Sequence, residues 1–120
     1  MTNYQLGEVE SRFAEIIWRE EPISSPELVR ICESELNWKK STTYTVLRKL
    51  CQRGIFKNEN GVVTSLISKE DFSSSAGKTF LDETFGGSLP AFIASFTAKN
   101  RLTAEEVEEI RRLIDEYGEK

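Results

Sequence analysis

The chain has 120 residues and a net charge of −4, with 38% hydrophobic residues, two cysteines and no histidine. This composition is adequate for one folded domain or two very small ones. The lack of histidine excludes Ser-His-Asp and Cys-His catalysis and histidine-containing metal sites. No glycine-rich phosphate loop occurs either, so we expect no enzyme, no cofactor and no metal site.

The first predicted element is an amphipathic helix over residues 7–20. Apolar side chains recur there at helical spacing between charged positions: Val9, Phe13, Ile16 and Ile17. Trp18 is expected at the edge of this buried face. One face of the helix should therefore contribute to a core.

The second predicted helix has two candidate starts. Ser24 with Glu27 fits a capping box, whereas Ser25 as the cap would place Pro26 at the first helical position. The sequence does not decide between the two serines. Asn37 is expected to end the helix.

The third predicted helix, over residues 40–53, lies where the charge reverses. Residues 36–58 carry six basic and no acidic residues, whereas residues 8–35 carry eight glutamates against three arginines. Periodicity predicts a buried side formed by Thr43, Val46, Leu47 and Leu50. The opposite side mixes cations with hydroxyl groups, a combination that can bind phosphates and read base edges. The segment thus favours contact with double-stranded DNA.

A predicted hairpin follows this basic helix directly. Asn60-Gly61 separates two β-prone runs at 55–59 and 62–67, which is a strong short-range hairpin signal. This order predicts a winged helix-turn-helix, with the wing at about residues 55–67. It also argues against the simpler interpretation that the cations only form a solvated helix face.

In a helix-turn-helix, the second helix of the pair enters the major groove. We therefore expect base contacts from Thr42, Thr45 and Arg48. Contacts to the DNA backbone are expected from the remaining polar residues of the helix start and the wing: Lys39, Lys40, Ser41, Tyr44, Lys49 and Lys57.

The remainder of the chain has a different character. Residues 69–120 carry seven basic and eleven acidic residues, so we do not expect a DNA surface there. Helices are predicted over residues 70–85, 89–98 and 104–117, with Ser68 capping the first and Thr103 with Glu106 forming a capping box at the last. Gly77 costs a helix about 1 kcal/mol relative to alanine, which permits a break there.

The predicted domains are therefore residues 1–69, which bind DNA, and residues 70–120, which dimerise. A helical segment as short as residues 70–120 can bury little apolar surface within itself. We expect a homodimer whose interface contains Phe72, Phe80, Leu81, Phe85, Leu89, Phe92, Phe96, Val107, Ile110 and Ile114. Two-fold symmetry would match a palindromic operator with half-sites about 34 Å apart. A monomeric helical core is the alternative.

Several motifs carry a family likeness. The segment NWKKSTTYTVLRKL at residues 37–50, followed by Arg53-Gly54-Ile55, resembles the recognition-helix signature of the penicillinase-repressor family. Ile16-Ile17-Trp18, Phe85-Gly86-Gly87-Ser88 and LTAEEVEEI at residues 102–110 extend the likeness over most of the chain. The resemblance implies a dimeric bacterial repressor, mostly α with a small β-hairpin. Its parts would be an N-terminal winged helix-turn-helix and a C-terminal helical dimerisation domain.

The resemblance also suggests how DNA is released. Antibiotic-responsive members are cleaved at an Asn-Phe bond in the second C-terminal helix, through a membrane sensor pathway. Ser95-Phe96 stands at that position here, which makes it the candidate cleavage site and a sensor protease a candidate partner. The CxC pairs of copper-responsive members do not occur in this sequence, so metal sensing is not implied.

The apolar runs and the two cysteines bear on the compartment of the protein, and two alternative functions remain. A membrane-spanning helix needs about 20 consecutive apolar residues, and no apolar run in the sequence is nearly that long. No secretory leader is evident either. Cys32 and Cys51 lack CxxC spacing and suggest free, packed thiols in a reducing compartment. We expect a cytoplasmic protein without a membrane partner. A winged-helix module for protein contact and a thiol- or ligand-responsive regulator are the alternatives.

Overall fold

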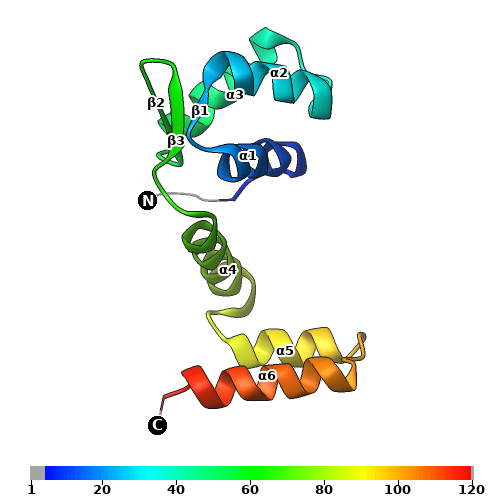
Figure 1. Cartoon of the computed structure of the whole chain (residues 1–120). Coiled ribbons are helices and arrows are strands. Elements are labelled where there is room, and N and C mark those ends of the chain that lie inside the picture. The colour runs from blue at the N-terminus through cyan, green and yellow to red at the C-terminus, as the bar shows by residue number, and fades with distance from the viewer. Residues whose placement is uncertain (1–4, 120) are drawn as a thin grey trace. The chain divides into compact units, whose positions relative to one another are not determined.

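The computed structural model describes residues 5–119 and is mostly helical with a small antiparallel sheet, which confirms the predicted fold class (Figure 1). The chain divides into two compact units, one ending at Thr79 and the other starting at Phe80. The elements are α1 (Glu8–Glu20), β1 (Ile23–Ser24), α2 (Ser25–Leu36), α3 (Lys40–Gln52), β2 (Phe56–Glu59), β3 (Val62–Ser65), α4 (Lys69–Phe85), α5 (Leu89–Thr97) and α6 (Ala104–Tyr117).

The ends of α2 settle the alternative that the sequence left open. The Oγ atom of Ser24 accepts a hydrogen bond from the backbone N–H of Glu27 at 3.3 Å, so Ser24 is the cap. Ser25 is the first helical residue and is buried. Asn37 ends the helix in the left-handed conformation, with φ 57° and ψ 38°, as the sequence predicts.

The predicted hairpin is present, and a third strand joins it. Asn60 and Gly61 both have positive φ angles, 53° and 79°, as a type I′ turn requires. The strand order is β1-β3-β2, and Ile23 of β1 lies opposite Val63 of β3. The strand β1 was not predicted, because two residues carry no periodic pattern and their pairing depends on a distant part of the chain.

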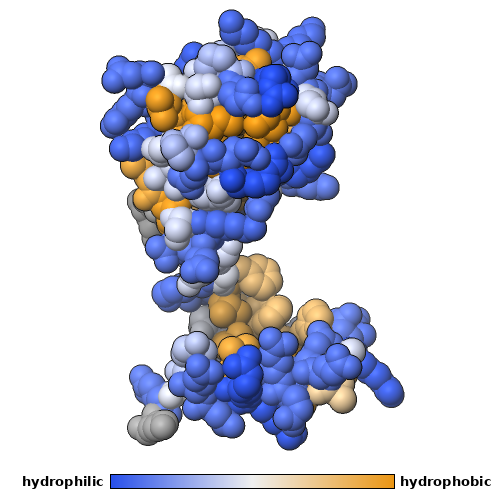
Figure 2. All heavy atoms as spheres, in the orientation of Figure 1, coloured by the Kyte–Doolittle hydropathy of each residue, from blue (hydrophilic) through white to orange (hydrophobic). Residues whose placement is uncertain are grey.

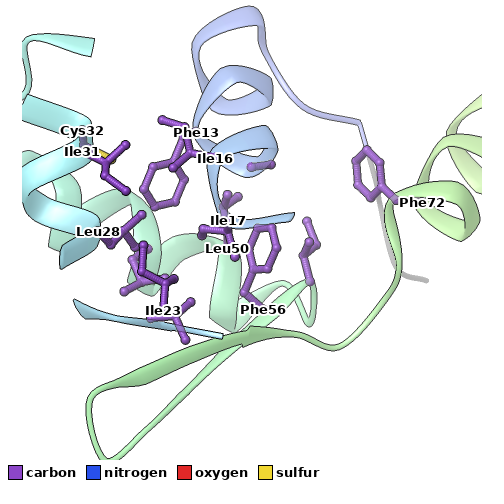
Figure 3. Close-up of a cluster of buried hydrophobic side chains, with 14 residues drawn as sticks. Phe13, Ile16, Ile17, Ile23, Leu28, Ile31, Cys32, Leu50, Phe56 and Phe72 are labelled. Carbon is purple, nitrogen blue, oxygen red and sulfur yellow. The ribbon is translucent and has the colours of Figure 1, made fainter. Parts of the chain in front are cut away.

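The core of the N-terminal unit is built from α1, α2, α3 and the sheet, with one side chain from α4 (Figure 3). Its members are Phe13, Ala14, Ile16, Ile17, Ile23, Leu28, Ile31, Cys32, Leu47, Leu50, Ile55, Phe56, Val63 and Phe72. The prediction for Val9 is wrong, since its side chain is 51% exposed. Val9 lies in the first turn of α1, and the buried face of that helix begins only at Phe13.

The C-terminal helices begin where the capping signals predict. Ser68 accepts from the backbone N–H of Asp71 at 3.0 Å at the start of α4. Thr103 and Glu106 form the reciprocal capping box of α6, with distances of 2.8 and 3.0 Å. The helix α4 continues through Gly77 without a break.

The described residues of the C-terminal unit, 80–119, form no closed core. In this unit α5 and α6 run in opposite directions (Figure 1), and apolar atoms reach its surface in Figure 2. Among residues 80–119, none is buried. No helix within residues 5–119 has the length and apolar character needed to cross a membrane.

Candidate nucleic-acid interface

A short turn between α2 and α3 sets the position of the basic helix. After Asn37, the backbone N–H of Trp38 donates to the carbonyl oxygen of Cys32 at 3.3 Å. The ring of Trp38 stacks on Phe13 of α1, with ring centroids 5.4 Å apart. Lys39 then occupies the N-cap position of α3 in an extended conformation. These contacts hold the start of α3 against α1 and α2.

The helix α3 has one buried and one exposed side, as its periodicity predicts. Thr43, Leu47 and Leu50 face the core, and Thr43 is only 1% exposed. Of the nine predicted DNA-contacting residues, Tyr44 and Lys57 are half-buried. The other seven are exposed: Lys39, Lys40, Ser41, Thr42, Thr45, Arg48 and Lys49. The fold therefore gathers the predicted base-reading residues on an accessible helix face.

The first turn of α3 is electrostatically suited to an anion. It contains no acidic side chain, and Lys39 and Lys40 are exposed beside it. The first backbone N–H groups of any helix lack partners within that helix, and the helix dipole adds positive potential there. A phosphate placed at this end would meet both kinds of positive charge.

One cation of α3 is already paired, a contact that sequence reasoning missed. The Nζ atom of Lys49 lies 2.9 Å from Oε2 of Glu10, whose other oxygen accepts from the backbone N–H of Gly7 at 3.1 Å. The hydrogen bond from Lys49 is the largest cause of a lowered pKa at the Glu10 carboxyl. The charge of Lys49 is thus partly offset by α1, so Lys49 adds less to the positive field than Lys39 or Lys40.

The hairpin is held to the end of α1 by the carboxylate of Glu21. Glu21 accepts from the backbone N–H of Ser65 at 2.8 Å and from its hydroxyl at 2.9 Å. Lys57 lies 3.5 Å from Glu59 on the same strand. A hollow of about 240 Å³ separates α3 from β2 and is lined by Tyr44, Leu47, Arg48, Cys51 and Asn58. The helix and the wing therefore contribute polar side chains to one continuous surface.

The two cysteines are poorly disposed for thiolate chemistry. Both are free; Cys32 is buried and Cys51 is half-buried. Burial raises the pKa of the Cys32 thiol to about 11 and also raises the pKa of Cys51. A raised pKa lowers the fraction of reactive thiolate at neutral pH. The geometry thus does not favour the thiol-responsive alternative.

The residues predicted for dimerisation lie in two different environments. Phe72 is 9% exposed and packs in the N-terminal core against Trp18, so we omit it from the interface proposed below. Phe80, Leu89, Phe96 and Ile114 are exposed, whereas Leu81, Phe85, Phe92, Val107 and Ile110 are half-buried. The ring of Phe92 lies within 6.0 Å of those of Phe80, Phe85 and Phe96. Ser95 is exposed beside Phe96 in α5.

The part of the chain that the structure describes contains no cluster of three or more side chains able to hold a metal ion. The charged hollows of the surface are lined by residues engaged with one another, such as Arg19 and Glu35, which lie 2.6 Å apart. The basic face of α3 with the wing is therefore the strongest candidate site.

Comparison with known proteins gives a consistent result. A family model described as "Penicillinase repressor" matches residues 6–116. The methicillin resistance regulatory protein MecI of Staphylococcus aureus (strain Mu50) is 23% identical over 93% of this chain and 94% of its own length. The penicillinase repressor of Bacillus licheniformis is 22% identical, covering 94% and 91%. The penicillinase repressor of Staphylococcus aureus is 27% identical, covering 88% and 86%.

Proposed function

The chain belongs to the penicillinase repressor family, whose members are DNA-binding regulators and not enzymes, and from that premise we propose that this transcriptional repressor acts as a homodimer on a palindromic operator. In this proposal residues 1–69 bind DNA, residues 70–120 dimerise, and the protein acts in the cytoplasm. The recognition helix is α3, and the wing is the β2–β3 hairpin.

The observation that carries the proposal is the exposed, cationic face of α3, which continues into the wing. Thr42, Thr45 and Arg48 are exposed in the first three turns of the helix, where a recognition helix meets base edges. The flanking residues are assigned to phosphates, which fix register but carry no sequence information: Lys39, Lys40, Ser41, Tyr44, Lys49 and Lys57.

Dimerisation is supported by the open apolar surface of the C-terminal unit. Ile114 is 59% exposed, and Phe80, Leu89 and Phe96 are also exposed. Apolar surface of this kind is normally covered, and a two-fold partner covers the same patch on both subunits. Such a dimer would place two α3 helices on half-sites about 34 Å apart, or a multiple of that distance.

A salt titration tests DNA recognition. An operator would first be selected from random duplexes, and the logarithm of its affinity would then be followed against the logarithm of salt concentration. Counterion release predicts a steep decline, and Lys39→Ala should reduce the slope by about one while weakening all sequences alike. The control is Lys99→Ala, since Lys99 is exposed in the C-terminal unit. Equal slopes for the wild type and Lys39→Ala would contradict the assignment.

Release from DNA by proteolysis is proposed at the Ser95–Phe96 bond, with a sensor protease as the partner. Both residues are exposed in α5. A chain cut there would lose the covalent link between the winged unit and α6, and with it part of the proposed interface. Mass spectrometry of the cleaved repressor would identify the bond, and an intact α5 after derepression would contradict this route.

A further inference from the structure

Trp18 lies where three elements of the N-terminal unit meet. Its indole N–H donates to the carbonyl oxygen of Ile67 at 3.1 Å, immediately before α4. Its ring centroid lies 5.4 Å from that of Phe56 on β2 and 5.3 Å from that of Phe72 on α4. One side chain of α1 therefore touches both a wing strand and the start of α4.

A second contact joins α1 to α4 in the same place. The Nζ atom of Lys69 lies 2.6 Å from Oε1 of Glu15. Glu15 and Trp18 are three residues apart on α1, and Lys69 and Phe72 are three residues apart on α4, so each pair occupies one helix face. Two positions on one face of α1 thus contact two positions on one face of α4.

These contacts between α1 and α4 lie at the first turn of α4, where Lys69 and Phe72 meet Glu15 and Trp18. Ser68 caps this turn through its hydroxyl, and its carbonyl oxygen accepts from the N–H of Phe72 at 2.9 Å. Phe72 is the buried residue of α4, whereas residues 73–79 are exposed or half-buried. The root of α4, meaning residues 67–72, is therefore held against α1, with Trp18 contacting both Ile67 and Phe72.

We propose that Trp18 is a positioning residue that sets the spacing between operator half-sites. By fixing the root of α4 to the winged unit, it fixes the direction in which α4 leaves the DNA-binding surface. This inference rests on the proposed dimeric function, in which α4 ties each recognition helix to the two-fold axis. One added base pair moves a half-site by about 3.4 Å and rotates it by about 35°. If α4 is held in one orientation, the dimer binds half-sites at altered spacing more weakly. If this contact is weakened, α4 can reorient and the dimer binds the altered spacing more nearly as well.

The test uses the full-length protein and the operator selected from random duplexes. Trp18→Phe keeps an aromatic ring but removes the N–H that donates to Ile67. Affinities would be measured for the operator, for derivatives with one or two base pairs added or removed between half-sites, and for a duplex with a single half-site. Discrimination against altered spacing should fall about threefold to tenfold, as expected when one neutral hydrogen bond is lost. Affinity for the single half-site should stay at the wild-type value.

The chain offers a matched control and a second variant. Glu20 pairs with Arg19 at 2.8 Å, so Glu20→Gln removes an ion pair at the end of α1 and should keep the wild-type discrimination. Glu15→Gln removes the ion pair with Lys69, whose side chains are about half exposed, and should lower discrimination in the same direction by a smaller factor. Because Glu15→Gln changes a surface residue, it tests the contact between α1 and α4 even if Trp18→Phe folds poorly.

Three outcomes would overturn the inference. Unchanged discrimination in both Trp18→Phe and Glu15→Gln would show that the root of α4 does not set the spacing. An equal loss of affinity for every duplex, including the single half-site, would show that Trp18 only supports the fold. A wild-type protein that binds one half-site as tightly as two would instead refute the dimeric function itself, and the inference with it.

Discussion

The two units of this chain differ in how far they bury their apolar side chains. Within residues 5–79, the N-terminal unit buries fourteen apolar residues among three helices, a small sheet and the root of α4. Among residues 80–119, none is buried, although rings of α4 and α5 touch one another. A closed core needs elements on several sides, and two helices with the end of a third leave faces open. The N-terminal unit therefore encloses a core of its own, whereas residues 80–119 leave their apolar side chains exposed or half-buried.

The largest effect is expected from opening the closed core. Phe13 is fully buried and supports the ring of Trp38. Phe13→Ala should lower the free energy of unfolding by about 3 to 5 kcal/mol, because it leaves a cavity as well as losing burial. Urea unfolding followed by circular dichroism would measure the change. A loss below about 1 kcal/mol would mean that the core is looser than its packing indicates.

The open surface of the second unit gives the next largest effect. If a partner covers it, Ile114→Lys should raise the dimer dissociation constant by about 100-fold, since a lysine would be buried at the interface. Glu108→Lys is the control, because Glu108 is an exposed, charged position of the same helix. Sedimentation equilibrium would compare the masses. Equal dissociation constants for both variants would contradict the proposed interface.

The charge contrast between the units leads to a third prediction. Arg48 is exposed on the basic face of α3, and its removal should cost about 1 to 3 kcal/mol of binding free energy on the selected operator, with relaxed preference at one base pair. Arg111→Ala, in the acidic half of the chain, should leave affinity unchanged. Binding to a set of single-base operator variants would measure both. A uniform loss across that set would assign Arg48 to a phosphate.

A smaller effect of opposite sign is expected in α4, close to where the two units divide. A Cβ atom added at Gly77 would meet nothing within 4 Å, and the residue lies inside a continuous helix. Gly77→Ala should therefore stabilise the chain by about 0.5 to 1 kcal/mol. Thermal unfolding would reveal the gain. A destabilised variant would indicate that this face of α4 is covered in the assembled protein.

The smallest effect concerns the ion pair between Glu10 and Lys49. Because the pKa of the Glu10 carboxyl is lowered in the folded chain, the pair adds stability at neutral pH that disappears as the pH falls through that lowered value. Glu10→Gln should cost about 0.2 to 1 kcal/mol at neutral pH and nothing in strong acid. Free energies of unfolding measured across this pH range should converge in acid. Parallel curves would exclude the contribution.

Local signals in the sequence predicted most elements of the fold. Hydrophobic spacing and capping residues identified the helices, and Asn60-Gly61 identified the hairpin, because these patterns act over a few residues. Pattern alone could not choose between Ser24 and Ser25, since both offer a hydroxyl at a plausible position. It also missed β1, whose two residues become a strand only by pairing with Val62 and Val63.

The sequence predicted which face of α3 is exposed, but not which of its cations forms an ion pair. The periodicity of α3 placed Thr45 and Arg48 opposite the buried Leu47 and Leu50, and the structure agrees. The contact between Lys49 and Glu10 joins positions far apart in sequence, so spacing gave no sign of it. The burial of Phe72 against Trp18 could not be predicted for the same reason. The helical periodicity of a segment does not show which distant residue a ring will contact.

The placement of the indoles has an optical consequence. Both tryptophans of the chain, Trp18 and Trp38, belong to the N-terminal unit, so intrinsic fluorescence excited at the red edge reports on that unit alone. Circular dichroism in the far ultraviolet samples the helices of both units. The difference between the two signals during melting would therefore follow the C-terminal unit without any added label.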